Sequence, residues 1–115
     1  LSSLKDGLNY VLIFYSTGCS HCLREVPEIY EYMKGKTNTK VIAFAMETSD
    51  DVWSNYRLKM PGWHHVLGLG KWENPTAKTY QINSTPSYFV LGMDKQIIAI
   101  PRSIDDLKFI LDELN

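Results

Sequence analysis

The sequence predicts one α/β domain over residues 1–115, with a central mixed β-sheet of parallel strands and a C-terminal antiparallel hairpin, flanked by helices. Two buried-strand patterns, each followed by a helical pattern, indicate parallel strands joined by crossover helices. Two apolar runs around a short turn near the C-terminus indicate the hairpin. A length of 115 residues suits a single domain with one hydrophobic core.

The first strand is predicted over Leu8–Ser16, where the residues are β-branched, aromatic and almost continuously apolar. Such a run is typical of a central strand that is buried on both faces of a sheet. A helix follows and runs to about Lys34, with Pro27 expected to bend it. Its apolar residues recur at steps of four, three and four and therefore share one face: Cys22, Val26, Ile29 and Met33.

A second buried strand is predicted over Lys40–Met46, and a second helix within the segment Thr48–Met60. That helix is expected to carry the acids Asp50 and Asp51 in its first turn. Its apolar stripe comprises Val52, Trp53, Tyr56 and Met60. The segment 61–74 is rich in Gly and Trp without a clear period, so we interpret it as a linking stretch.

The C-terminal third is predicted as a short helix, a hairpin and a last helix. Asn74 is a helix cap before Pro75, and proline suits the first position of a helix. The hairpin occupies the segment 86–101. Ser103 caps the last helix, whose acidic first turn suits the helix dipole. The residues expected to face the core are Ile104, Leu107, Ile110, Leu111 and Leu114.

Composition excludes several classes of partner. Twelve Lys and Arg against thirteen Asp and Glu give a net charge of -1, without a basic block that would indicate nucleic acid or an anionic membrane surface. The longest apolar runs, Val11–Phe14 and Ile97–Ile100, are too short to span a bilayer. The chain begins at Leu1 with no signal-peptide pattern, so we expect a trimmed form, with any leader or membrane anchor outside this sequence.

Both cysteines of the chain, Cys19 and Cys22, lie between the first strand and its helix. Their spacing permits a redox pair, a metal site, a static disulfide or two reduced core residues. The position at a helix start favours the redox pair, because backbone N–H groups and the helix dipole stabilise a thiolate at Cys19. We therefore expect Cys19 to be the nucleophile and Cys22, on the inner face of the helix, to be the resolving thiol.

The histidines suggest an alternative to the redox pair. This is a metallochaperone-like zinc or copper module that uses Cys19, Cys22 and a histidine. His64 and His65 are adjacent, so in an extended segment they point to opposite faces and do not reach one ion together. We interpret both as surface or core imidazoles and expect no bound metal. His21 lies between the cysteines, where its imidazole is expected to stabilise the Cys19 thiolate and make the disulfide more oxidising. A solvated spacer residue is the other interpretation of His21.

Three motifs stand out: FYSTGCSHC after the first strand, CSHCLREVP across the helix start, and STPSYFVL before the hairpin. Together they make the chain resemble the thioredoxin-like superfamily, and within it the TlpA-like thiol-disulfide oxidoreductases of bacterial cell envelopes. The resemblance implies a thioredoxin-like fold, a redox-active Cys19–Cys22 disulfide and no other cofactor. It also implies that the Thr85-Pro86 bond is cis and faces the disulfide, where an extended client chain would pair beside Thr85.

The resemblance further implies protein thiols and disulfides as partners, among them apoproteins of cytochrome c maturation, and a membrane-bound electron donor. It implies a location in the periplasm or on the outer face of a bacterial envelope, and we expect a monomer. Glu25 lies three residues after Cys22, on a neighbouring face of the helix, and is expected to accept the proton that Cys22 must lose. An exposed helix glutamate is the alternative interpretation of Glu25.

Two positions depart from the pattern of many thioredoxins. Gly18 stands where those proteins have a Trp before the first cysteine, and Ile13 stands where they have a buried acid. The missing acid makes Glu25 more important as a proton acceptor. The missing Trp leaves the surface beside Cys19 more open.

Overall fold

The fold is described here from a computed structural model. The described residues are 9–36, 38–47, 49, 51–82, 84–94 and 96–114. Leu8 of the expected first strand and Asp50 of the expected second helix lie outside them. The strands are β1 (Asn9–Tyr15), β2 (Thr39–Glu47), β3 (His64–Leu69), β4 (Ser87–Leu91) and β5 (Ile97–Ala99). The helices are α1 (Ser20–Met33), α2 (Trp53–Tyr56), α3 (Pro75–Thr79) and α4 (Ile104–Leu114), with single 3-10 turns η1 (Arg57–Lys59) and η2 (Lys71–Glu73).

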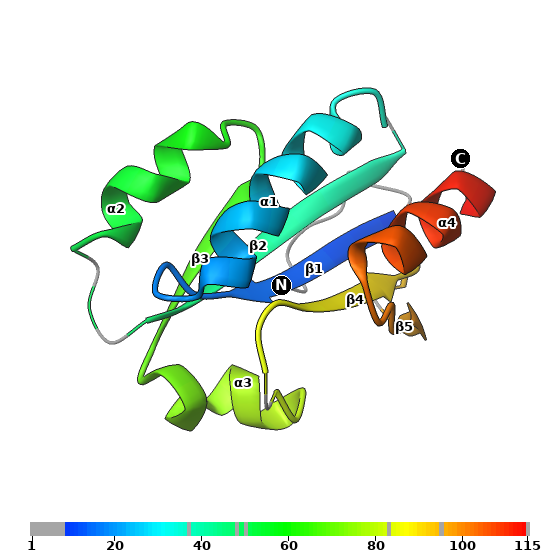
Figure 1. Ribbon diagram of the computed structural model, residues 1–115. Coiled ribbons are helices and arrows are strands. Elements are labelled where there is room, and N and C mark those ends of the chain that lie inside the picture. The colour runs from blue at the N-terminus through cyan, green and yellow to red at the C-terminus, as the bar shows by residue number, and fades with distance from the viewer. Residues whose placement is uncertain are drawn as a thin grey trace.

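The strands form one sheet in the order β3-β2-β1-β4-β5, with helices on both of its faces (Figure 1). β1 is the central strand, and it pairs in parallel with β2 and antiparallel with β4. β2 and β3 are parallel, whereas β4 and β5 form the antiparallel hairpin. The mixed α/β sheet predicted from the sequence is therefore confirmed.

Side chains of β1 alternate between two hydrophobic cores, because successive residues of a strand point to opposite faces. Val11, Ile13 and Tyr15 pack in the core that α1, α2 and α4 cover. Leu12 and Phe14 pack in the smaller core under α3. The whole strand from its second residue onward is buried, which confirms the prediction of a central strand.

Helix α1 begins directly after the turn that follows β1, with Cys19 as its N-cap residue. Pro27 lies within the helix, on its exposed side. The buried residues of α1 are the four that the sequence predicted, namely Cys22, Val26, Ile29 and Met33. The helix therefore places Cys22 in the core, while Cys19 lies at the N-terminus of the helix.

Two sequence predictions in the middle of the chain are wrong. The second helix makes only one α-helical turn before it tightens into η1, so the expected long helix does not form and Val52 is 63% exposed. The other members of the predicted stripe do pack in the core, namely Trp53, Tyr56 and Met60. The segment 61–74 is not merely a linking stretch, because it contains the edge strand β3. An edge strand is only partly buried and therefore lacks the continuous apolar run of a central strand. Gly68 within β3 contacts the ring of Phe44.

The C-terminal elements agree with the sequence predictions. Asn74 caps α3 by accepting a hydrogen bond from the backbone of Thr76, and Ser103 caps α4 by accepting one from the backbone of Asp106. Leu107 and Leu111 are fully buried, whereas Ile104 and Ile110 pack at the border of the core. Leu114, which was expected to face the core, is 38% exposed because it lies at the last turn of α4.

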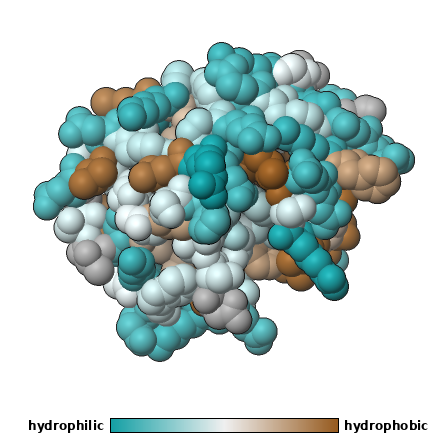
Figure 2. All heavy atoms as spheres, in the orientation of Figure 1, coloured by the Kyte–Doolittle hydropathy of each residue, from teal (hydrophilic) through white to brown (hydrophobic). Residues whose placement is uncertain are grey.

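Apolar residues gather on the surface over β5 and α4, at the right of Figure 2. Ile97, Ile98 and Phe109 of these two elements are exposed. An exposed apolar edge strand is a surface at which proteins can associate, and the monomeric state expected from the sequence stays a prediction. No helix within the described ranges is both long and apolar enough to cross a membrane.

We expect Gly68→Ala to lower the free energy of unfolding by about 1–3 kcal/mol, the usual cost of overpacking a core. A Cβ atom at Gly68 would lie 2.2 Å from the ring of Phe44, so the buried ring or one of the two strands must shift. Gly35→Ala is the matched control, since a Cβ atom there meets no atom within 4 Å. Equilibrium denaturation in urea measures both variants, and equal losses would contradict the packing argument.

Candidate active site

The two cysteines lie where β1 ends and α1 begins. Cys19 is the N-cap residue, in an extended backbone conformation, and its Sγ accepts a hydrogen bond from the backbone N–H of Cys22 at 3.2 Å. Cys19 is partly exposed and Cys22 is fully buried, and both are free thiols. The helix start therefore presents one sulfur to solvent and keeps the other inside.

A carboxylate from the neighbouring strand holds the turn before Cys19. Glu47, at the end of β2, accepts hydrogen bonds from the backbone N–H and the hydroxyl of Thr17, both at 2.7 Å. The backbone N–H of Cys19 donates to the carbonyl of Ser16 at 3.1 Å, which closes the turn. Sequence reasoning missed Glu47, although a glutamate at the end of a buried strand is an unusual residue that needs a polar partner.

The Thr85-Pro86 peptide bond is cis, as the sequence resemblance implies. The thiol of Cys19 donates to the carbonyl oxygen of Thr85, with 3.5 Å between sulfur and oxygen. The loop before β4 therefore lies directly beside the exposed sulfur, and the expected neighbourhood of Thr85, Pro86 and the cysteines is present.

The two thiols differ in their acidity. Burial acts to raise the pKa of Cys19, but hydrogen bonds from the Cys22 thiol, from the Thr85 side chain and from the first backbone N–H groups of α1 outweigh it and hold the pKa below its ordinary value. Burial, reinforced by the hydrogen bond to Cys19, raises the pKa of Cys22 to about 12. The arrangement therefore favours a thiolate at Cys19 over one at Cys22.

His21 acts on Cys19 through its backbone, whereas its imidazole contacts Arg24. Its backbone N–H is among the groups that lower the pKa of Cys19. Its Nδ1 accepts a hydrogen bond from the guanidinium of Arg24 at 2.6 Å, because arginine has no acceptor to offer in return. The pair brings a permanent positive charge to the first turn of α1.

Glu25 has a partner that the sequence did not suggest. The phenol of Tyr88, on β4, donates to Oε1 of Glu25 at 2.5 Å. Tyr88 is only 3% exposed, and Glu25 is half-buried. Burial, then the hydrogen bond to Glu25, and further the charges at Cys22 and Cys19 raise the pKa of Tyr88. The phenol therefore lies within electrostatic reach of the carboxylate and of both sulfurs.

The other histidines stand apart from the cysteines, at the beginning of β3. His64 is exposed, and Nε2 of His65 lies 2.8 Å from the carbonyl oxygen of Met60. Within the residues that the structure describes, no group of three His, Cys, Asp or Glu side chains is arranged to hold a metal ion. The metallochaperone alternative therefore gains no support from the geometry.

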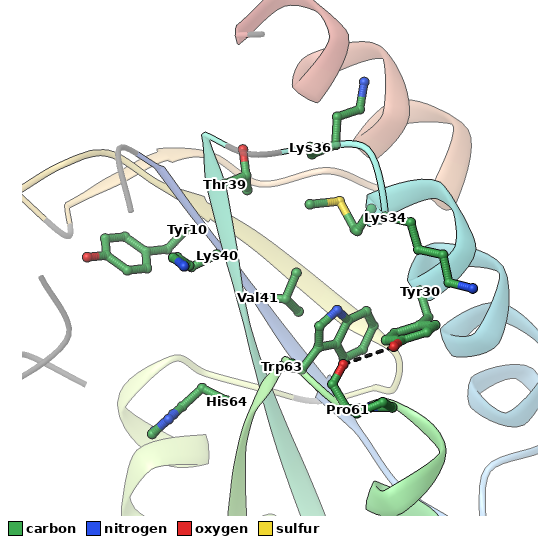
Figure 3. Close-up of a pocket in the computed structure, with 12 residues that line it drawn as sticks. Tyr10, Tyr30, Lys34, Lys36, Thr39, Lys40, Val41, Pro61, Trp63 and His64 are labelled. Carbon is green, nitrogen blue, oxygen red and sulfur yellow. Dashed lines mark hydrogen bonds between the residues drawn. The ribbon is translucent and has the colours of Figure 1, made fainter. Parts of the chain in front are cut away.

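A cavity of about 530 Å³ lies near the C-terminal end of α1, whereas the cysteines lie at the start of that helix (Figure 3). Tyr30 and Trp63 form one wall, and the hydroxyl of Tyr30 donates to the carbonyl of Pro61 at 2.9 Å. Lys34 and Lys36 at its rim pair with acids outside the cavity. Neither cysteine lines this space, so the cavity is separate from the redox motif.

A family model described as Thioredoxin-like matches residues 7–97 of the chain. No sequence among curated proteins matches the chain significantly. The matched range contains both cysteines, Glu25 and the Thr85-Pro86 bond, and it ends at the beginning of β5. The family match therefore covers all the residues of the candidate site.

The fold of this chain is also similar to that of several solved structures. A domain of a possible thiol-disulfide isomerase from Cytophaga hutchinsonii ATCC 33406 matches with a TM-score of 0.81 and 27% identity, over 99% of this chain and 79% of that one. A thiol-disulfide oxidoreductase from Bacteroides fragilis NCTC 9343 matches with a TM-score of 0.77 and 21% identity, over 93% and 81%. StoA from Bacillus subtilis matches with a TM-score of 0.70 and 22% identity, over 95% and 86%. The last two likenesses establish a shared fold.

We expect limiting iodoacetamide to alkylate Cys19 and leave Cys22 unmodified in the reduced protein. The reagent attacks thiolates, and Cys22 is buried with a pKa near 12. The rate of labelling should rise with pH and level off below pH 8.5, roughly the pKa of an ordinary thiol. Fragmentation of the alkylated peptide in a mass spectrometer locates the label, and unfolding in urea should allow both residues to react. Equal labelling in the folded protein would contradict the proposed asymmetry.

Proposed function

This chain belongs to the thioredoxin-like family and has the thioredoxin-like fold predicted from its sequence, and on that premise we propose that it is a thiol-disulfide oxidoreductase acting on protein clients. The observation that carries the proposal is the pair of unequal thiols at the start of α1. The sulfur of Cys19 is accessible, favoured as a thiolate and placed against Thr85, whereas Cys22 is buried and protonated. Such a pair suits a two-step exchange.

In the first step, the thiolate of Cys19 attacks a client disulfide. A bond forms between Cys19 and one client sulfur, and the other client sulfur leaves as a thiolate. In the second step, Cys22 transfers its proton to Glu25 and its sulfur attacks Cys19, which releases the second client sulfur. The client gains two electrons, and the protein ends with a Cys19–Cys22 disulfide; the reverse sequence oxidises a client dithiol.

The backbone at Thr85 and Pro86 is proposed to position the client. The Thr85 carbonyl lies 3.5 Å from the sulfur of Cys19, so a client strand paired at this edge would bring its own sulfur to the nucleophile. The absence of a bulky residue at Gly18, which is exposed, leaves room for such a strand beside Cys19. Backbone pairing would explain acceptance of clients with different side chains.

We further propose that the protein works in an oxidising compartment, in the periplasm or at the outer face of a bacterial envelope. The CSHCLREVP motif supports this proposal through its resemblance to TlpA-like proteins. Apoproteins of cytochrome c maturation are the proposed clients, and a membrane-bound donor is proposed to return the disulfide to dithiol. The same resemblance supports these partners. Metal binding is not part of the proposal.

We expect Cys22→Ser to accumulate mixed disulfides with clients and Cys19→Ser to accumulate none. Removal of the resolving thiol stops the reaction at the covalent intermediate, whereas removal of the nucleophile prevents it from forming. Each variant is expressed in cells, quenched with acid and analysed on non-reducing gels, with mass spectrometry of the shifted bands. A metal site would predict lower metal affinity for both variants without any adduct. Equal trapping by both, or trapping by neither, would sink the proposed function.

His21 is proposed to stabilise the reduced state through its imidazole, which accepts a hydrogen bond from Arg24 and holds that positive charge near the start of α1. We expect His21→Ala to make the Cys19–Cys22 couple more reducing, by an amount on the order of 30 mV, which is a tenfold change in the equilibrium constant. Equilibration with glutathione redox pairs measures the potential. His64→Ala is the matched control, since His64 is an exposed histidine on β3. An unchanged potential in His21→Ala would leave His21 as a spacer.

A further inference from the structure

Tyr88 has no part in the exchange described above, yet it makes a close contact with the proton acceptor. Its hydroxyl donates to Oε1 of Glu25 at 2.5 Å, a contact between β4 and α1 across 63 residues of sequence. A buried phenol needs an acceptor, and a carboxylate gives it a charge-assisted hydrogen bond. The contact therefore fixes a charged group at the edge of the core.

The sheet register places Tyr88 behind the cysteines. Tyr88 pairs with Ile13 of β1, and both side chains pack in the core that contains Cys22. Charge on either sulfur acts to raise the pKa of Tyr88, after the larger effects of burial and of Glu25. The phenol is thus close to the carboxylate on one side and within reach of the sulfurs on the other.

A glutamate on a helix surface normally samples several rotamers and extends into water. A hydrogen bond from Tyr88 restricts that freedom and draws the carboxylate toward the interior.

We propose that Tyr88 is a positioning residue that holds the Glu25 carboxylate turned inward for the transfer of the Cys22 proton. The inference rests on the proposed function, since a proton acceptor is needed only if Cys22 attacks a mixed disulfide. In that step the proton passes from the Cys22 sulfur to Glu25, the Cys22 sulfur bonds to Cys19, and the client sulfur leaves with the electron pair of the broken bond. Tyr88 itself keeps its proton and forms no covalent bond.

Stopped-flow reaction of the reduced protein with one equivalent of dithiobis-nitrobenzoate separates the two steps. Cys19 displaces the first thionitrobenzoate, and Cys22 displaces the second while the Cys19–Cys22 disulfide forms. We expect Tyr88→Phe to leave the first phase unchanged and to slow the second by about tenfold, a modest part of the effect of general base catalysis. Absorbance of the released thiolate records both phases.

The pH profile distinguishes positioning from a structural effect. The second phase of the wild type should depend weakly on pH between about 6 and 9, because Glu25 accepts the Cys22 proton and hydroxide is not needed for that step. In Tyr88→Phe it should rise by up to about tenfold per pH unit, because hydroxide must then remove the proton. Glu25→Gln should show the same profile, and the double variant should be no slower than Glu25→Gln alone.

Tyr30→Phe is the matched control, because Tyr30 is an α1 phenol that donates to the Pro61 carbonyl at the far cavity. It should leave both phases and the pH profile unchanged. The positioning role would be overturned if Tyr88→Phe kept the wild-type rate and pH profile of the second phase, or if the double variant were slower than Glu25→Gln alone. Either outcome would leave the proposed function intact. Release of a single equivalent by the wild type, with no internal disulfide, would instead overturn the proposed function.

Discussion

The structure depends on one junction, the turn in which the buried strand β1 ends and α1 begins at Cys19. The sulfur of Cys19 accepts the backbone N–H of Cys22 and so takes the place of a capping oxygen. Unpaired N–H groups and the helix dipole favour negative charge at that point. Because β1 is packed between two cores and Glu47 holds Thr17, the turn has little freedom to move. The reactive sulfur is therefore positioned by the whole fold.

The difference between the two thiols follows from their places in one helical turn. Cys19 lies at the mouth of the helix, where backbone donors stabilise its thiolate, and its pKa falls. Cys22 lies in the core, where burial stabilises the neutral thiol, and its pKa rises. The proposed roles of the two cysteines thus follow from position and not from residue type. The proposed second step is made harder by burial, because a buried thiol must lose its proton before it can attack.

Local sequence patterns sufficed for β1, α1 and the helix caps, since these depend on residues a few positions apart. The resemblance supplied the cis bond before Pro86, which spacing alone does not indicate. Strand β3 escaped prediction because it is a half-buried edge strand, with a glycine required by the ring of Phe44. Glu47 and Tyr88 escaped because their partners lie 30 and 63 residues away, and only the folded sheet brings them together.

The site lacks the buried acid that many thioredoxins carry on β1. The register of β1 and β4 shows which residues lie there instead. Ile13 occupies that position, and Tyr88 is its partner on the adjacent strand. A carboxylate at Ile13 would be fully buried and would bear a large desolvation cost. Glu25 on α1 is only half-buried, so it keeps contact with water while the phenol of Tyr88 ties it to the interior. In the proposed second step, a carboxylate on α1 that keeps contact with water could pass an accepted proton to solvent, which a fully buried acid at position 13 could not do directly.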